Sequence, residues 1–315
     1  MQALVRHGAA EWIAQSVASA VARAEATGNL ICGLYYLESY CTQLRTGRVN
    51  GQVEPIVSQP KPAVVRVDAQ LGFAQPAFQR GIDVAVTVAQ EFGSATMAVC
   101  HSHTCTAMGF FTEQIAVKGL IGIGMTNAPA CVSPPGGTKA VLGTNPRSMA
   151  VPNADGGVAF QFDQSTSAIA IGKIRVAAAA GDKIPLGWAV DNNGDPTDDP
   201  HAALEGSLVS AGGYKGYGFG LMVEVLAAAV TGSLTSTSAP PLKAPEGPSH
   251  GLGQFYFLLD PTACAGDSFW ARLDQLAEAV ESQPNARLPG SNAARPTEVS
   301  INGALWEKVR ELAGP

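Results

Sequence analysis

The clearest indication of the fold is the stretch SATMAVCHSHTCTAMGFFTEQIAVKGLIGIGMT, which occupies residues 94–126. Residues 94–99 form a short apolar run of the kind found in buried strands, and a polar turn at 101–104 follows it. Apolar residues then recur at helical spacing over 110–118, and a second apolar run occupies 120–126. This alternation of strand, helix and strand predicts an α/β core.

The segments on either side of this stretch predict a protein whose two chain ends are mostly helical. Helices are expected at 9–26, 30–44, 77–92, 169–180, 221–230, 268–282 and 304–313. Strands are expected at 64–67, 149–151, 157–162 and 253–260, with loops at 53–63 and 235–250. We therefore predict a helical domain for dimerisation and substrate binding, built from 1–75 and 255–315, around an α/β domain at 76–254.

Composition excludes several classes of protein. The net charge is −6 and no Lys/Arg cluster occurs, which argues against a nucleic-acid-binding surface. No apolar run reaches the roughly 18 residues of a membrane span. Six cysteines without a CxxC pair predict reduced thiols in a cytoplasmic protein. Charged residues make up 15 %, against about 25 % in an average soluble protein, so we expect a partner subunit to cover part of the surface.

Familiar catalytic motifs are absent, because the chain has no GxGxxG, GxxxxGK[ST], HExxH or GxSxG. Three local groups remain as candidates. His101 and His103 could bind a metal, although a polar loop is the commoner arrangement and we predict no metal site. The glycine-rich segment 212–218 brings Lys215 to a loop that either binds an anion or merely needs positive φ. Ser and Thr in 163–167 either cap a helix or bind a phosphate.

Five segments taken together resemble the type 2 malate/L-lactate dehydrogenase family. This family also includes ureidoglycolate dehydrogenase, 2,3-diketo-L-gulonate reductase and Δ1-piperideine-2-carboxylate reductase. The segments are GTNP at 143–146, DQSTS at 163–167, GWAVDNNGDPTDDP at 187–200, GGYKGYG at 212–218 and RLPG at 287–290. Their order matches the family from about residue 25 onward. The resemblance implies a cofactor domain that is not of the Rossmann type, NADPH or NADH as cofactor, and a homodimer that includes part of the N-terminal helical region in its interface.

The resemblance also implies which residues hold the cofactor. Backbone N–H groups at a helix start and a lysine ammonium both suit a negatively charged pyrophosphate. The implied cofactor-binding residues are Asn127, Thr144, Asp163, Ser165, Thr166, Ser167 and Lys215.

The chain departs from the family where the family places its catalytic residues. Relatives carry Ser-His-Gly-x-x-Arg near the N-terminus, and the matching stretch here is ICGLYY at 31–36. Cys32 therefore stands at the position of the histidine that works with the aspartate matching Asp163. A second family histidine aligns with Thr104, and His103 lies one residue earlier. The predicted catalytic residues are Asp163, His103 and Cys32.

Tyr36 stands where relatives carry the arginine that binds the substrate carboxylate. Residues expected to contact the substrate are therefore Tyr36, Arg48 and Arg147, and Arg45 is a further candidate for the carboxylate.

The missing histidine bears on which substrate is reduced. Reduction of a 2-oxo acid develops alkoxide charge and needs a proton donor, whereas a cyclic imine can arrive already protonated. Residues 67–77 also look more like the Δ1-piperideine-2-carboxylate reductases. We therefore predict an NAD(P)H-dependent reductase of Δ1-piperideine-2-carboxylate or Δ1-pyrroline-2-carboxylate, forming pipecolate or proline. The alternatives are a 2-hydroxy-acid dehydrogenase of the malate/lactate type and a catalytically silent member that binds a cofactor or a partner.

Overall fold

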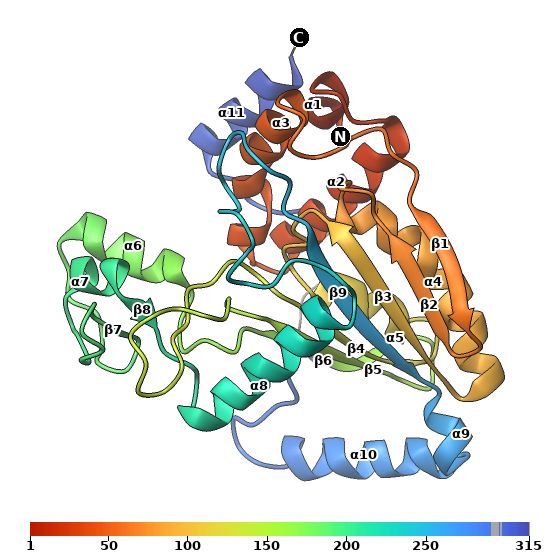
Figure 1. Cartoon of the computed structure of the whole chain (residues 1–315). Helices are drawn as coiled ribbons and strands as arrows, with labels where there is room; N and C mark the ends of the chain where they lie inside the picture. The colour runs from red at the N-terminus through yellow and green to blue at the C-terminus, as the bar shows by residue number, and fades with distance from the viewer. Residues whose placement is uncertain (291–295, 297, 315) are drawn as a thin grey trace.

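A seven-stranded mixed sheet forms the centre of the protein (Figure 1). The computed structural model describes residues 1–290, 296 and 298–314. Only β2 and β3 are parallel, and every other neighbouring pair is antiparallel. In spatial order the strands are β1 (Ile56–Lys61), β2 (Val64–Asp68), β3 (Ser94–Ser102), β9 (Leu252–Leu259), β4 (Ile121–Thr126), β5 (Arg147–Pro152) and β6 (Val158–Gln164).

Helices cover both faces of this sheet. In Figure 1, α4 (Ala74–Phe92) and α5 (Gly109–Ala116) lie behind the sheet. Helix α8 (Tyr214–Glu224) lies in front of it and continues into a π-helical turn at Val225–Ala229. The main core fills the space between α4, α5 and the sheet, because apolar residues recur along α4 at helical spacing and the central strands are buried.

Three aromatic rings lie at the centre of that core. The ring centroids of Phe78 and Phe111 are 5.0 Å apart, and those of Phe78 and Tyr256 are also 5.0 Å apart. All three residues are fully buried. They join α4, α5 and β9, so the last strand in the sequence packs against helices from the first half of the chain.

The two ends of the chain form one helical layer at the top of Figure 1. It contains α1 (Gln2–Arg6), α2 (Glu11–Ala26), α3 (Leu37–Arg45) and α11 (Gly303–Ala313). Val309 and Leu312 of α11 pack on a buried cluster that includes Leu4, Ile13 and Tyr40. The predicted division of the chain at 75/76 and 254/255 stays a prediction, and both predicted domains contribute strands to one continuous sheet.

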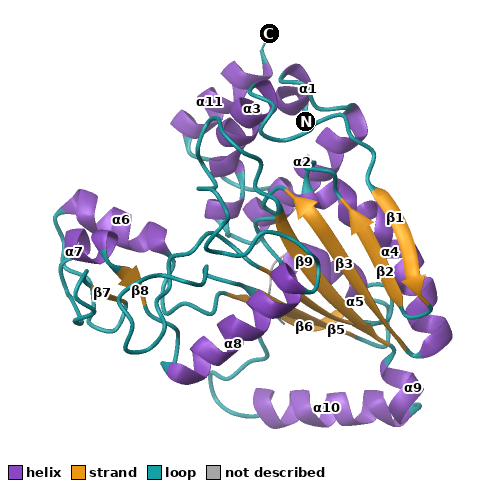
Figure 2. Cartoon of the chain, viewed as in Figure 1, coloured by secondary structure: helices purple, strands orange, loops and turns teal. Residues whose placement is uncertain are grey.

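A separate lobe projects to the left in Figure 2. It contains α6 (Ile171–Ala180), β7 (Ala189–Val190), α7 (Pro200–Glu205) and β8 (Ser207–Leu208) around a small core of its own. At the lower end of the sheet, α9 (Pro261–Ala265) leads into α10 (Ser268–Glu281).

The predicted α/β class is confirmed, and three local predictions need correction. The expected loop at 53–63 contains β1, which tolerates Pro60 because an edge strand has one unpaired side. The helix expected from residue 30 begins as two 3₁₀ turns at Leu30–Cys32 and Leu34–Tyr36, separated by Gly33. Helix α8 begins seven residues before the predicted start at 221, since its first turn lies within the glycine-rich segment.

Candidate active site

Asp163 lies on β6, and its carboxylate is held by a backbone N–H at the start of α5. Its Oδ2 accepts a hydrogen bond of 2.8 Å from the Gly109 backbone N–H. A Cβ atom at position 109 would lie 2.7 Å from Gln161 Nε2 and 3.3 Å from Asp163 Cβ, so a larger residue here would push the Gln161 side chain away. One side of Asp163 is open to solvent while protein surrounds the others. Burial raises the pKa of the Asp163 carboxyl, and N–H groups of Gly109 and Met108 oppose this shift.

The charge of Asp163 acts on Cys32, whose catalytic role stays a prediction. The thiol lies at the end of the first 3₁₀ turn and is half-buried. Burial raises the pKa of Cys32 to about 12; the negative charge of Asp163 adds to this, and a hydrogen bond with Asn29 opposes it. Cys32 therefore remains a neutral thiol at physiological pH, and it is a weak proton donor.

Tyr36 lies beside Cys32, and two cationic side chains lie near it. Burial raises the pKa of Tyr36 to about 12; Cys32 and Tyr35 add to the rise, and the positive charge of Arg175 on α6 opposes it. The Lys243 Nζ lies 4.6 Å from the centroid of the Tyr36 ring and 3.1 Å from that of Tyr35. Sequence reasoning missed both cations, because an exposed lysine in a proline-rich loop and an exposed arginine on a helix carry no distinctive local pattern.

A cavity of about 220 Å³ adjoins Asp163. Asn29, Gly109 and Gln161 line it, together with the ion pair between Arg23 and Glu113, whose closest N–O distance is 2.7 Å. The RLPG motif at 287–290 contributes to this region, since Pro289 O accepts a hydrogen bond from the Gln161 N–H and Gly290 lines the cavity. The motif therefore contributes to the surroundings of Asp163 rather than forming a separate site.

The third predicted catalytic residue, His103, lies in a buried network. Its Nε2 is 2.7 Å from Gln43 Oε1, and its ring stacks on His250 with centroids 3.9 Å apart. Tyr40 and Phe73 pack edge-on against the same ring. Burial and the positive charge of a neighbouring arginine hold the pKa of His103 well below its usual range, so the ring is neutral. These contacts give His103 a structural environment, and its catalytic role stays a prediction.

Arg48 is also engaged within the protein. Its guanidinium is 1 % exposed and donates to the carbonyls of Pro241, Ala244 and Pro248 over 2.7, 2.5 and 2.9 Å. It therefore holds the segment 241–250, which we call the anchor loop, against the end of α3.

Two other arginines were candidates for the substrate carboxylate. The Arg147 guanidinium lies over the Phe219 ring at 4.0 Å from its centroid, where β5 meets α8. Arg45 is exposed in the last turn of α3. Of Tyr36, Arg48 and Arg147, Tyr36 is the residue that the structure places beside Cys32.

The predicted cofactor segments are hydrogen-bonded to one another. Thr166 donates to the Thr144 carbonyl through its backbone N–H (2.9 Å) and its hydroxyl (3.1 Å). The Ala211 N–H donates to Thr166 O, and Ser167 pairs with Ser210. Three segments that lie far apart in sequence thus form one surface beside the start of α8.

This surface fits an anionic cofactor. Lys215 is exposed in the first turn of α8, where helix N–H groups lack partners within the helix. A Cβ atom at Gly216 would lie 1.8 Å from the Ala211 carbonyl oxygen, so only glycine permits the loop to fold this closely against the helix. Positive helix-end potential and a mobile ammonium group suit a pyrophosphate.

Two predicted cofactor residues, Asn127 and Ser165, form hydrogen bonds within the protein. Asn127 is buried, its Nδ2 donates to Leu234 O over 2.7 Å, and its Oδ1 accepts from the Gly253 N–H. It therefore links the end of β4 to β9. Ser165 is exposed and its hydroxyl lies 3.1 Å from that of Ser167. Their roles in cofactor binding stay predictions.

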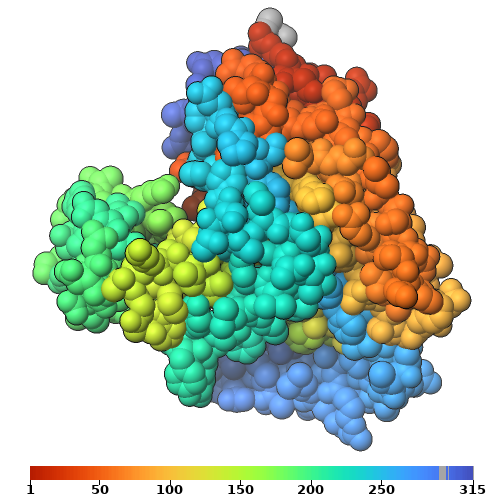
Figure 3. Space-filling view, viewed as in Figure 1, coloured from red at the N-terminus to blue at the C-terminus, as the bar shows by residue number. Residues whose placement is uncertain are grey.

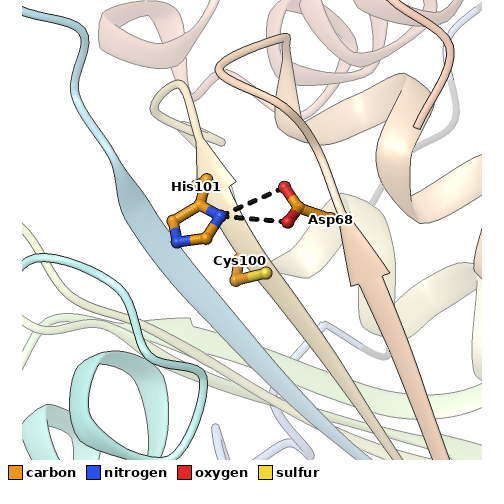
Figure 4. A group of neighbouring side chains, drawn as sticks. All are labelled: Asp68, Cys100 and His101. Carbon is orange, nitrogen blue, oxygen red and sulfur yellow. Dashed lines mark hydrogen bonds and ion pairs between the residues drawn. The ribbon is translucent and has the colours of Figure 1, made fainter. Parts of the chain in front are cut away.

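The two histidines considered for a metal have separate partners. His101 Nδ1 lies 3.1 Å from Asp68 Oδ1, and with the Cys100 thiol these groups form a compact cluster at the ends of β2 and β3 (Figure 4). Arg66 also approaches Asp68, at 3.5 Å, and the thiol donates to a backbone carbonyl. Protein groups thus account for the cluster, while His103 belongs to the network described above.

Comparisons with known proteins agree with this architecture over the whole chain. Residues 1–307 match the profile of the malate/L-lactate dehydrogenase family. The crystal structure of delta1-piperideine-2-carboxylate reductase from Pseudomonas syringae pvar. tomato superimposes with a TM-score of 0.91 at 34 % identity. That match covers 98 % of this chain and 95 % of the other.

Two curated relatives differ in the substrates in their names. A Delta(1)-pyrroline-2-carboxylate/Delta(1)-piperideine-2-carboxylate reductase of Pseudomonas putida is 36 % identical over 310 residues, which cover 98 % of this chain and 91 % of the relative. A (2R)-3-sulfolactate dehydrogenase (NADP(+)) of Chromohalobacter salexigens is 38 % identical over 289 residues, covering 92 % and 86 % respectively.

Proposed function

Because the chain belongs to the malate/L-lactate dehydrogenase family and is an oxidoreductase, we propose that it uses NADPH or NADH to reduce a cyclic 2-imino acid. The substrate is Δ1-piperideine-2-carboxylate or Δ1-pyrroline-2-carboxylate, and the product is pipecolate or proline. Relatives with these substrates in their names share 34–36 % identity with nearly the whole chain.

The observation that carries this proposal is the weak acid beside Asp163. Cys32 has a pKa of about 12, far from neutral pH, whereas efficient general acids have pKa values near the pH at which they work. A protonated imine needs no such acid. Hydride adds to its C2 carbon, the C=N π electrons pass to the ring nitrogen that already carries the proton, and a secondary amine results.

Asp163 favours the same substrate. In its ionised form the carboxylate would attract the positive iminium nitrogen. When bound, the reduced nicotinamide supplies the hydride. Lys215 and the first turn of α8 would hold the pyrophosphate, and Thr144, Thr166 and Ser167 would form the adjoining surface.

The test is to follow NADPH or NADH oxidation with each cyclic imine, and then with pyruvate, oxaloacetate and 3-sulfopyruvate. Imine turnover at least tenfold more efficient in kcat/KM is the expected result. The second candidate, a 2-hydroxy-acid dehydrogenase, is favoured by the similarity to the sulfolactate dehydrogenase and predicts the opposite preference. Oxidation of the cofactor with none of these compounds would contradict both.

We also propose a homodimer. Helix α8 and its π-helical extension carry exposed apolar side chains, among them Tyr214, Phe219 and Val225. Leu30 and Ile31 in the N-terminal region are also exposed. A second copy would remove this surface from water, in keeping with the low charge content. Sedimentation should give twice the 32.4 kDa of one chain.

The proposed compartment is the cytoplasm. All six cysteines are free thiols, and Cys264 is exposed. Reduced thiols are typical of cytoplasmic proteins. Among the helices in the described ranges, none is long and apolar enough to cross a bilayer.

A further inference from the structure

We propose that Lys243 binds the carboxylate of the substrate, and that the anchor loop holds its ammonium group in place for this purpose. This inference rests on the proposed function, because it assumes a substrate that carries a carboxylate. Position 36 offers a tyrosine ring and no guanidinium, so the cation has to come from another element.

The positive charge of Lys243 is available to an anion. Within the described part of the chain, its recorded contacts are with the faces of the Tyr35 and Tyr36 rings, and no carboxylate lies within ion-pair distance. An aromatic face attracts an ammonium group without neutralising it. The two rings thus orient Nζ while its hydrogen-bond donors can still reach a carboxylate.

The backbone on both sides of Lys243 is held by buried groups. Gln43 Nε2 donates to the carbonyls of Leu242 and Ala244 over 2.7 and 2.8 Å. His250 Nε2 lies 3.0 Å from Leu242 O, and Arg48 adds the bonds already described. Three side chains therefore fix the peptide units adjoining one exposed lysine, which is more support than a solvated loop residue needs.

The position of Lys243 also suits the substrate. Tyr36, on which its ammonium lies, belongs to the 3₁₀ turn that follows Cys32. Asn29, whose carbonyl accepts from the Cys32 N–H, lines the same cavity as Asp163. Arg175 approaches Tyr36 from the lobe, and in Figure 3 the surface is hollowed between that green lobe and the main body. In a cyclic 2-imino acid the carboxylate is attached to the carbon that receives the hydride. A substrate with its carboxylate on Lys243 would therefore extend its ring towards Cys32 and Asp163.

The experiment compares Lys243→Met and Lys243→Arg with wild type at saturating NADPH. Lys243→Met should raise KM for the cyclic imine at least tenfold, leave KM for NADPH unchanged, and leave activity on the uncharged carboxamide analogue within twofold. Lys243→Arg should restore most of the affinity. Lys61→Met, which removes an exposed lysine at the end of β1, is the matched control and should behave as wild type. A KM for the imine within twofold of wild type in Lys243→Met would overturn the proposal.

Failure of the proposed function gives a different pattern. If wild type prefers a 2-oxo acid, the imine assignment fails, and the same rise in KM for that acid in Lys243→Met still supports a carboxylate site. If wild type reduces neither class, titration calorimetry with pyrrole-2-carboxylate in the presence of NADP⁺ replaces the assay. Binding at least tenfold weaker in Lys243→Met supports the site. Equal binding, or no binding to wild type, overturns it.

Discussion

The imidazole rings of His103 and His250 are stacked, with centroids 3.9 Å apart and planes inclined by 22°. Both rings are buried beside Arg48, and each is hydrogen-bonded as a neutral group: His103 to Gln43, and His250 to the Leu242 carbonyl. Desolvation and the arginine charge lower the pKa of His250 to about 3 and that of His103 well below its usual value. This pair ties the central sheet to the anchor loop.

The first prediction is that stability falls as the pH drops below neutrality. The unfolded histidines bind protons below about pH 6.5, whereas folded His250 stays neutral until near pH 3 and the pKa of folded His103 also lies well below its usual value, so acid favours the unfolded state. At pH 5 His250 lowers the free energy of unfolding by about 2 kcal/mol. Thermal unfolding from pH 7 to pH 5 should show a smaller loss of Tm in His250→Gln than in wild type. The exposed His201→Gln is the control, and parallel pH profiles for all three proteins would refute the assignment.

The second prediction concerns Cys32. In Cys32→Ala, kcat for the cyclic imine should stay within about tenfold of wild type, because a general acid usually contributes 10²–10⁴-fold and none is used here. Cys32→His should raise 2-oxo acid reduction by pairing an imidazole with Asp163. Steady-state kinetics with both substrates checks this, with the exposed Cys264→Ala as control. A loss of more than a hundredfold on the imine would show that the thiol is the acid.

The third prediction is that Lys215→Ala weakens cofactor binding without unfolding the protein. An ammonium–phosphate contact contributes roughly 1.5–3 kcal/mol, which corresponds to about a ten- to hundredfold rise in KM for NADPH. Tm should stay within one or two degrees, since Lys215 is exposed. KM for the imine should change little in Lys215→Ala. In the Lys61→Ala control, KM for NADPH should also change little. An unaltered KM for NADPH is the contrary outcome.

The fourth prediction treats Arg48 as a positioning residue. Arg48→Met leaves the Pro241 and Pro248 carbonyls without their donor, and each buried unsatisfied group costs about 1–3 kcal/mol. Tm should fall. KM for the imine should rise while KM for NADPH stays unchanged, because the substitution disturbs the anchor-loop backbone that holds Lys243. Arg45→Met removes an exposed arginine from the same end of α3 and should alter neither quantity. Equal rises in both KM values would point to general unfolding instead.

Helices and strands with a clear hydrophobic periodicity could be predicted from the sequence. Residues whose role depends on contacts far away in the sequence were harder to predict. The helix at 77–92 and the strands at 94–99 and 120–126 follow from their hydrophobic patterns. The structure extends the first two by three residues each and begins the third one residue later. β1 was missed because its prolines are ordinarily read as a loop signal. The start of α8 was missed because its glycines serve a close backbone approach rather than a break.

At the site, the motifs drew attention to Asp163, Cys32 and the three segments that the structure joins by hydrogen bonds, and the roles of these residues stay predictions. The surroundings of Lys243 could not be predicted from motifs. Its position depends on Gln43 and Arg48, which lie about 200 residues earlier in the chain. These side chains bind backbone carbonyls, and the positions of carbonyl groups cannot be predicted from the pattern of side chains.

The place of β9 between β3 and β4 has a consequence for biosynthesis. While the ribosome is still making the first 250 residues, β3 and β4 each present a bare edge where β9 will later insert. Unpaired edges are templates for association with other chains. The sheet of the nascent protein can therefore be completed only after Leu252–Leu259 has been synthesised. Until then, chaperone binding or rapid completion of synthesis has to prevent aggregation. A stop codon just before residue 252 would release a chain in which β3 and β4 each have an unpaired edge. We expect such a chain to aggregate rather than to retain partial activity.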